Sequence, residues 1–151
     1  MHPIFRTAIA VSFLLAAAPV EAASFPGKKS QFHSFDRYDF EHNGRRSIIV
    51  APKEVAEGRP WVWRARFFGH EPQTDKALLE RGWHIAYTDI GGLFGAPQAV
   101  AIWDGFHQHL TTEYGFHKRP ALEGMSRGGL IIFNWAKQNP DKVSCIYGDA
   151  P

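Results

Sequence analysis

The sequence predicts an α/β fold, in which helices cover both faces of a mostly parallel sheet to make a three-layer α/β/α sandwich. First, strand-like and helix-like segments alternate along the chain, an order that requires crossover connections between parallel strands. Second, a glycine-flanked serine in the segment GMSRG, at 124–128, stands between a short strand-like segment and a helix-like one. Third, 151 residues with 44% hydrophobic and 21% charged content are enough for one domain with a real core.

Composition and charge argue against several classes of protein. The formal net charge is only +2 and the seventeen basic residues are scattered, whereas a nucleic-acid-binding protein gathers them on one face. Eight histidines occur, but none stands in an H-E-x-x-H pattern, and a single cysteine excludes C-x-x-C. The sequence therefore predicts neither a nucleic-acid partner nor a metal site.

Residues 1–22 are typical of a signal peptide. Arg6 supplies positive charge, and the apolar run 8–18 is too short to span a bilayer. Small residues near the end of the segment favour cleavage after Ala22. The alternatives are a buried N-terminal helix and a membrane anchor. Cleavage predicts an exported protein, periplasmic or extracellular, without stable membrane insertion.

Residues 23–34 are a polar lead-in, and the domain itself is expected to span residues 35–151, beginning with a β-hairpin. Strand-like alternation leads to Asn43-Gly44, and an apolar return strand follows at 46–51. Asn-Gly favours a tight hairpin because both residues accept the positive φ angles that the turn requires.

Two strands and a helix come next. Residues 61–67 predict a third strand with its aromatic residues on one face. Thr74 is a good N-cap for a helix that ends at Gly82, and residues 83–90 are apolar enough for a fourth strand buried on both faces. The glycine-rich loop 91–95 is not G-x-G-x-x-G, so no dinucleotide cofactor is predicted.

A long amphipathic helix is expected from Pro97, where the missing N–H costs nothing, to Gly115. Its apolar residues recur at helical spacing, which favours packing against the sheet: Ala99, Trp103, Phe106, Leu110 and Tyr114. The sixth and last expected strand, at 143–147, surrounds Cys145, which favours a buried and inert thiol.

The segment around Ser126 matches G-x-S-x-G, the pattern of a nucleophile elbow, in which a serine sits on a sharp turn between a strand and a helix. The required setting is predicted, since a fifth strand at 120–123 precedes the serine and a helix from residue 127 follows it. Glycines flank the serine because the chain passes so close that side chains there would clash. The alternative is a serine that only caps a helix, although Gly128-Gly129 is a poor helix start.

Four further segments, together with this elbow, carry a resemblance to a known family: the starting hairpin, WVWRARFFGHEP at 61–72, DIGGLFG at 89–95 and YGDAP at 147–151. The chain resembles the N-terminal portion of a secreted bacterial α/β-hydrolase of the esterase or prolyl-oligopeptidase-like kind. The resemblance implies the sheet of this fold, truncated after about the sixth strand, so that residues 35–151 are an incomplete domain.

This resemblance implies that Ser126 is the nucleophile of a serine hydrolase and that the backbone N–H of Arg127 is one donor of its oxyanion hole. The second donor is expected in the loop after the third strand, from Phe67, Phe68 or Gly69, with Phe68 preferred.

The same resemblance places His70 and Phe94 along the substrate site. The expected substrate is a small-molecule or carbohydrate ester, such as an acylated carbohydrate, although a peptide or lipid ester also fits. No cofactor is implied.

The general base is missing from the sequence. In this family the order along the chain is serine, acid, histidine, but no histidine follows His117. The acid and base are therefore expected beyond the end of this chain, with Asp149 as an alternative acid that is more typical of a turn residue. His107, His109 and His117 are expected to be solvated.

Two further points stay open at this level. Glu123 is an unusual charge for a central strand, and we expect it to contact Arg127 or another buried partner. The alternative function is that of a non-catalytic, degenerate or truncated hydrolase domain, used for binding or without independent function.

Overall fold

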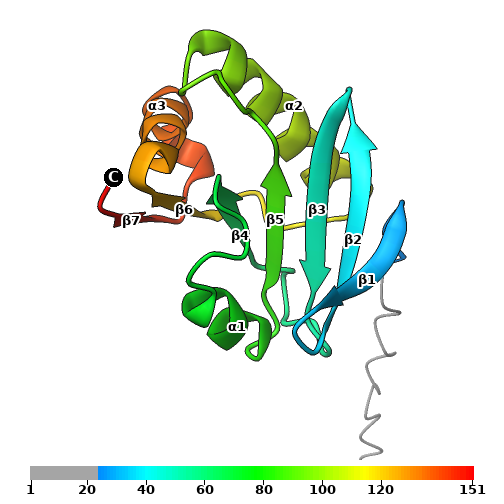
Figure 1. Cartoon of the computed structure of the whole chain (residues 1–151). Coiled ribbons are helices and arrows are strands. Elements are labelled where there is room, and N and C mark those ends of the chain that lie inside the picture. The colour runs from blue at the N-terminus through cyan, green and yellow to red at the C-terminus, as the bar shows by residue number, and fades with distance from the viewer. Residues whose placement is uncertain (1–23) are drawn as a thin grey trace, which may run out of the picture.

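The computed structural model describes residues 24–151, so the predicted signal peptide, residues 1–22, lies outside the described residues. The described part forms one mixed sheet in the order β1-β2-β3-β5-β4-β6-β7 (Figure 1). Its strands are β1 (Lys28–Phe32), β2 (Phe35–His42), β3 (Arg45–Ala51), β4 (Trp61–Ala65), β5 (His84–Thr88), β6 (Ala121–Met125) and β7 (Cys145–Asp149). The neighbouring pairs β1–β2, β2–β3 and β3–β5 are antiparallel. The pairs β5–β4, β4–β6 and β6–β7 are parallel. The predicted crossovers therefore build the parallel half of the sheet.

Helices cover both faces of this sheet, which confirms the three-layer α/β/α sandwich. The helices are α1 (Gln73–Leu79), α2 (Pro97–Glu113) and α3 (Gly129–Gln138), with short 3₁₀ turns η1 (Ser126–Gly128) and η2 (Pro140–Lys142). One buried cluster joins α2 and α3 to a face of the sheet, and a second joins α1 to the other face. Accordingly, α2 and α3 lie next to each other and away from α1 (Figure 1).

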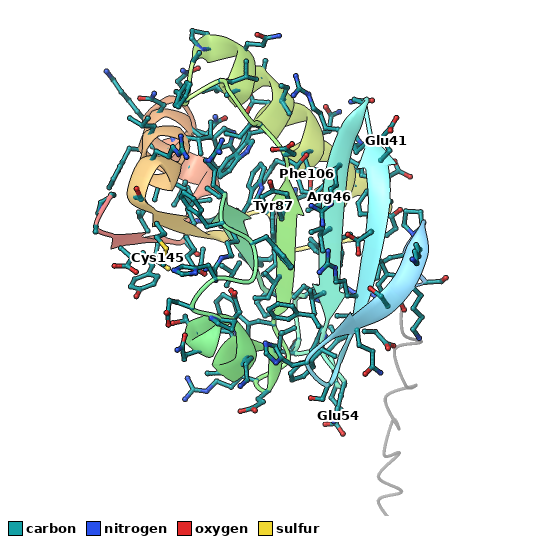
Figure 2. The ribbon with its side chains drawn as sticks, in the orientation of Figure 1. Glu41, Arg46, Glu54, Tyr87, Phe106 and Cys145 are labelled. Carbon is teal, nitrogen blue, oxygen red and sulfur yellow. The ribbon has the colours of Figure 1, made fainter. Side chains whose placement is uncertain are left out.

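The larger core is aromatic and lies between the sheet and the helix pair α2–α3. Trp63 of β4 stacks on Trp103 of α2 with ring centroids 3.9 Å apart, and Trp135 of α3 meets Trp63 edge-on at 5.1 Å. Phe106, also on α2, is fully buried and lies between that helix and the sheet (Figure 2). The aromatic stripe of the helix that begins at Pro97 therefore packs on the sheet as predicted. Burial of each such ring removes about 150–250 Å² of surface from water, which stabilises the folded state by about 4–6 kcal/mol as an upper estimate.

The hairpin of β2 and β3 confirms the Asn-Gly prediction, with φ of +50° at Asn43 and +71° at Gly44. The polar lead-in contains a strand that the sequence did not predict. This strand, β1, pairs with β2 at the edge of the sheet. Most of its residues are exposed, and Lys29 forms an ion pair with Asp36 at 2.8 Å. An edge strand without a buried face leaves no apolar alternation to detect.

Two predicted boundaries were wrong around α1. The third strand ends at Ala65 rather than Phe67, because Arg66 and Phe67 adopt positive φ angles of 60° and 43°, which break the extended conformation. Helix α1 begins at Gln73 after Pro72, so Thr74 lies inside the helix and is not its N-cap.

The last strand also differs from the prediction. It runs two residues later than expected, and all of its side chains are exposed, because β7 is an edge strand that pairs only with β6 among the described strands. The prediction of a buried Cys145 was therefore wrong: its thiol is free and exposed on β7 (Figure 2). Within residues 24–151, no helix has the length and apolar character needed to cross a bilayer.

Candidate active site

Ser126 sits on a sharp turn between strand β6 and the helical segment formed by η1 and α3. Met125 is still extended, with φ −93° and ψ 138°, whereas Ser126 has φ +49°, in the left-handed region that a serine rarely adopts. The chain direction reverses there, and η1 leads directly into α3. The strand–turn–helix setting that a nucleophile elbow requires is present.

The glycines on either side of Ser126 are required by close contacts. A Cβ on Gly124 would lie 2.6 Å from Cδ1 of Ile132 and 2.9 Å from the carbonyl group of Gly128. A Cβ on Gly128 would lie 2.5 Å from the carbonyl oxygen of Ala65, at the end of β4. Backbone atoms cannot move aside as a flexible side chain does. The G-x-S-x-G spacing is therefore a packing requirement, as predicted.

Ser126 is not an ordinary helix cap. Met125 holds the N-cap position of η1 and Gly128 that of α3, and neither helix start has a side-chain cap hydrogen bond. The side chains of Ser126 and Arg127 are both exposed. The N–H of Arg127 lies in the first helical turn, where backbone N–H groups lack intrahelical partners and attract negative charge. An anionic oxygen beside Ser126 would meet such a donor.

The loop after β4 lies against this turn. Phe67 is 38% exposed, and its ring centroid lies 5.8 Å from the guanidinium carbon of Arg66 and 5.8 Å from that of Arg127. Phe68 directs its side chain elsewhere, packing with ring centroids 5.3 Å from Phe32 and 5.7 Å from Tyr87. The structure thus brings the Phe67 side chain, and not that of Phe68, to the elbow.

The other two predicted site residues, Phe94 and His70, lie in loops. In the glycine-rich loop, Gly95 has no room for a side chain, because a Cβ there would lie 2.7 Å from the backbone of Leu130. The carbonyl oxygen of Gly95 accepts a 2.8 Å hydrogen bond from the side chain of Asn134. This contact holds the loop against α3 and leaves Phe94 55% exposed beside it. His70 is exposed, and its carbonyl oxygen accepts a hydrogen bond from Arg64.

No histidine among the described residues hydrogen-bonds to the Ser126 hydroxyl. The prediction that His107 is solvated was wrong, because it is 7% exposed and bonds through Nε2 to the Lys118 carbonyl at 2.9 Å. Burial lowers the pKa of His107, and burial together with the charge of Arg59 lowers the pKa of His84 to about 4. Both rings are therefore neutral packing elements at pH 7. Within residues 24–151 no cluster of metal-ligating side chains occurs.

Asp149 ends β7 next to the elbow, paired in register with Met125, and its side chain is exposed. Asp149 therefore lies across the strand pair from the residue that immediately precedes Ser126.

Three buried charged residues, Arg64, Asp75 and Glu123, lie together beneath the elbow, and of these only Glu123 stood out in the sequence. Glu123 contacts Arg64 at 3.1 Å rather than Arg127, which confirms the expected alternative of another buried partner. Arg64 also pairs with Asp75. The three residues are at most 5% exposed. The sequence signal was the presence of Arg64 and Glu123 in two otherwise apolar strands that become neighbours only in the folded sheet.

The sheet order, the helical layers and the serine turn together define a protein of the α/β-hydrolase fold, and solved structures agree. A cold-adapted esterase from an Arctic intertidal metagenomic library is similar over 83% of this chain and 63% of its own, with TM-score 0.64 and 16% identity. An acetyl xylan esterase from Aspergillus awamori is similar over 76% of this chain and 53% of its own, with TM-score 0.60 and 14% identity.

A predicted CIB-like hydrolase from Thermoplasma acidophilum is also similar, with TM-score 0.54, 16% identity, and coverage of 76% of this chain and 62% of its own. At such identities the likeness shows the fold alone. The chain spans less than two thirds of the length of these solved structures. No family model matches the sequence, and no curated protein matches it.

Proposed function

We propose that this chain carries the nucleophile of a serine hydrolase that cleaves an ester through an acyl-enzyme on Ser126. One observation carries the proposal: an exposed serine holds φ +49° at a strand-to-helix turn between two glycines that have no room for a side chain. Backbone strain in a non-glycine residue persists where the surrounding structure enforces it, and such residues cluster at active sites.

The proposed reaction has two halves. The Ser126 hydroxyl attacks the ester carbonyl carbon while a base takes its proton, and the tetrahedral oxyanion accepts hydrogen bonds from the Arg127 N–H and from an N–H in the loop 67–69. The alcohol leaves with that proton, and water then hydrolyses the acyl-enzyme to release the acid and restore the serine.

The acid and the base are proposed to come from polypeptide outside these 151 residues. Two observations support this: the chain spans at most 65% of the similar esterase chains, and no described histidine bonds to the serine. The absence of a described histidine bonded to Ser126 also favours the alternative of a non-catalytic hydrolase domain. Measuring turnover and binding separately distinguishes this alternative from an active hydrolase.

The proposed substrate is a small-molecule or carbohydrate ester, with an acylated carbohydrate as the leading candidate. The exposed rings of Phe67 and Phe94 offer apolar surfaces near the elbow. One similar structure is an acetyl xylan esterase by name. The proposal also includes export and a prolyl-oligopeptidase-like relationship, which rest on the sequence patterns alone.

Turnover of p-nitrophenyl acetate and of acetylated xylo-oligosaccharides by the protein as its gene encodes it tests this function. Ser126→Ala should lower kcat/KM by roughly 10⁴-fold or more, because the covalent step is lost. Ser144→Ala, which removes another exposed serine hydroxyl, should leave it unchanged. Equal rates in wild type and Ser126→Ala would contradict the proposal, and binding of the acetylated oligosaccharide without any turnover would support the non-catalytic alternative.

A further inference from the structure

Three buried charged side chains from three different elements meet on the α1 side of the sheet. Arg64 of β4, Asp75 of α1 and Glu123 of β6 are 1%, 0% and 5% exposed. The guanidinium of Arg64 bonds to Asp75 Oδ2 and lies 3.1 Å from Glu123 Oε1. Charges buried to this extent are costly unless they are paired and hydrogen-bonded. Their presence beside an elbow calls for a functional explanation.

The cluster contacts both halves of the proposed active site. Glu123 lies on β6, three residues before Ser126 at the turn that follows this strand, and Arg64 is its direct neighbour in the register of β4 and β6. Arg64 also donates from Nη2 to the carbonyl oxygen of His70, and the N–H of His70 donates to the Phe67 carbonyl at 3.0 Å. One arginine therefore ties the strand that carries the nucleophile to the loop expected to supply the second oxyanion donor.

The cluster holds two carboxyl groups but only one cation. Asp75 Oδ1 and Glu123 Oε2 are buried and have no hydrogen-bond donor among the described residues. A proton on Glu123 turns that carboxyl into a donor to Asp75, so a single proton satisfies both oxygens and leaves one carboxylate opposite Arg64.

The electrostatics favour this protonated arrangement. Burial, and then the charge of Asp75, raise the pKa of Glu123 to about 7, against the attraction of Arg64. Burial also raises the pKa of Asp75, and Arg64 opposes this rise. The charged and titratable groups that face Glu123 from the elements around it are Arg64, Asp75, Cys145, Tyr147 and Asp149.

We propose that Arg64, Asp75 and Glu123 are positioning residues: one proton shared between the two carboxyl groups holds the Ser126 turn and the loop 66–70 together, and loss of that proton loosens both segments. This role rests on the proposed function in that the two segments carry the nucleophile and the oxyanion donors. The clamp itself is a property of the fold and is measured without any substrate.

Amide hydrogen exchange, corrected for the intrinsic effect of pH, tests the clamp. In wild type, protection at residues 66–70 and 123–128 should fall about fivefold or more between about pH 5 and about pH 7, since one proton of linkage gives up to about tenfold per pH unit. Glu123→Gln keeps the shape and the donor to Asp75 without a titrating group, so its protection there should stay flat. The hairpin at 35–51 should not respond in either protein.

Two variants serve as controls. Glu57→Gln, which removes an exposed carboxylate, should behave as wild type. Asp75→Asn removes the charge that raises the pKa of Glu123, so the fall in protection should move to lower pH; this variant also tests the clamp if Glu123→Gln does not fold.

Identical pH profiles for wild type and Glu123→Gln at both segments would overturn the clamp. So would a loss of protection that appears equally in the hairpin. The samples are the protein as its gene encodes it, and labelling of Ser126 by a fluorophosphonate in them reports on the hydrolase function separately. An unreactive serine with an intact exchange difference would refute the function and leave the clamp in place.

Discussion

Ser126 combines an exposed hydroxyl with left-handed backbone geometry, and a non-glycine residue in that region costs the folded state about 1–3 kcal/mol. The turn persists because the surrounding contacts require it. The side chain of Ile132 and the carbonyl of Ala65 leave no space for a Cβ at Gly124 and Gly128, respectively.

A pair of substitutions at Ser126 measures this strain. Ser126→Gly should unfold at higher denaturant concentration than Ser126→Ala, with a free energy of unfolding about 1 kcal/mol higher, because only glycine adopts φ +49° without penalty. Urea unfolding of the two variants checks this, and both lack the hydroxyl, so the comparison isolates the backbone. A more stable alanine variant would show that the turn is not strained.

At single residues, the sequence was informative where the pattern fixes the backbone. The elbow glycines and Asn43-Gly44 adopt the geometry that their residue types predict. The burial of His107 and the exposure of Cys145 were missed, because both depend on which elements pack nearby, and that is a property of the tertiary fold. The amide that supplies the second oxyanion donor stays a prediction.

Among the elements, η1 packs against the end of β4 with no free space at Gly128, whereas α2 leaves free space at Gly105. A Cβ on Gly128 would lie 2.5 Å from the Ala65 oxygen, but a Cβ on Gly105 would meet nothing closer than 3.9 Å. Gly105 also sits in the interior of a 17-residue helix, where glycine is a poor choice.

Alanine at these two glycines should therefore have opposite effects. Gly128→Ala should lower the free energy of unfolding by about 1–3 kcal/mol through overpacking. Gly105→Ala should raise it by about 0.5–1 kcal/mol, because helical propensity improves without a clash. Thermal or urea unfolding of both variants checks the signs. A destabilised Gly105→Ala protein or a neutral Gly128→Ala protein would contradict the packing described for these elements.

Elements with a buried face were predictable, and elements without one were not. The helix from Pro97 and the strand at 84–88 are periodic or apolar and were found. The edge strands β1 and β7 are exposed, so β1 was missed and β7 was placed two residues early. The start of α1 was misplaced because Pro72 takes the cap position ahead of Thr74, which has the better side chain for capping.

For the molecule as a whole, the cluster of Arg64, Asp75 and Glu123 joins strands β4 and β6 to helix α1. Residues from three separate parts of the sequence form it, so no local pattern predicts it. It also ties overall stability to pH. The pKa of Glu123 is raised from 4.5 to about 7 in the folded protein, so the folded state holds this proton more tightly than the unfolded chain does.

This sets the sign of a stability prediction. The stability that the Glu123 proton contributes to the folded state is fully present below about pH 4.5 and is lost as the pH rises through about 7. Relative to Glu123→Gln, the wild-type free energy of unfolding should fall by a few kcal/mol, at most about 3, over that range. Urea unfolding across pH measures the difference.

The comparison with Glu123→Gln is essential because buried histidines act in the opposite direction. The pKa of His84 is lowered to about 4, so its contribution appears as the pH rises toward 6.5 and is lost as the pH falls. Subtracting the two profiles cancels this histidine contribution. A difference between wild type and Glu123→Gln that does not change with pH would refute the raised pKa of Glu123.

The α/β-hydrolase fold places Ser126 at the carboxyl end of a central parallel strand, and the central claim is that this serine is a nucleophile. Reaction of the protein as its gene encodes it with a fluorophosphonate, followed by peptide mass spectrometry, tests the claim most directly. We predict a covalent adduct on Ser126 in wild type and in Ser144→Ala, and none in Ser126→Ala. An unlabelled wild-type protein, or labelling that persists in Ser126→Ala, would contradict it.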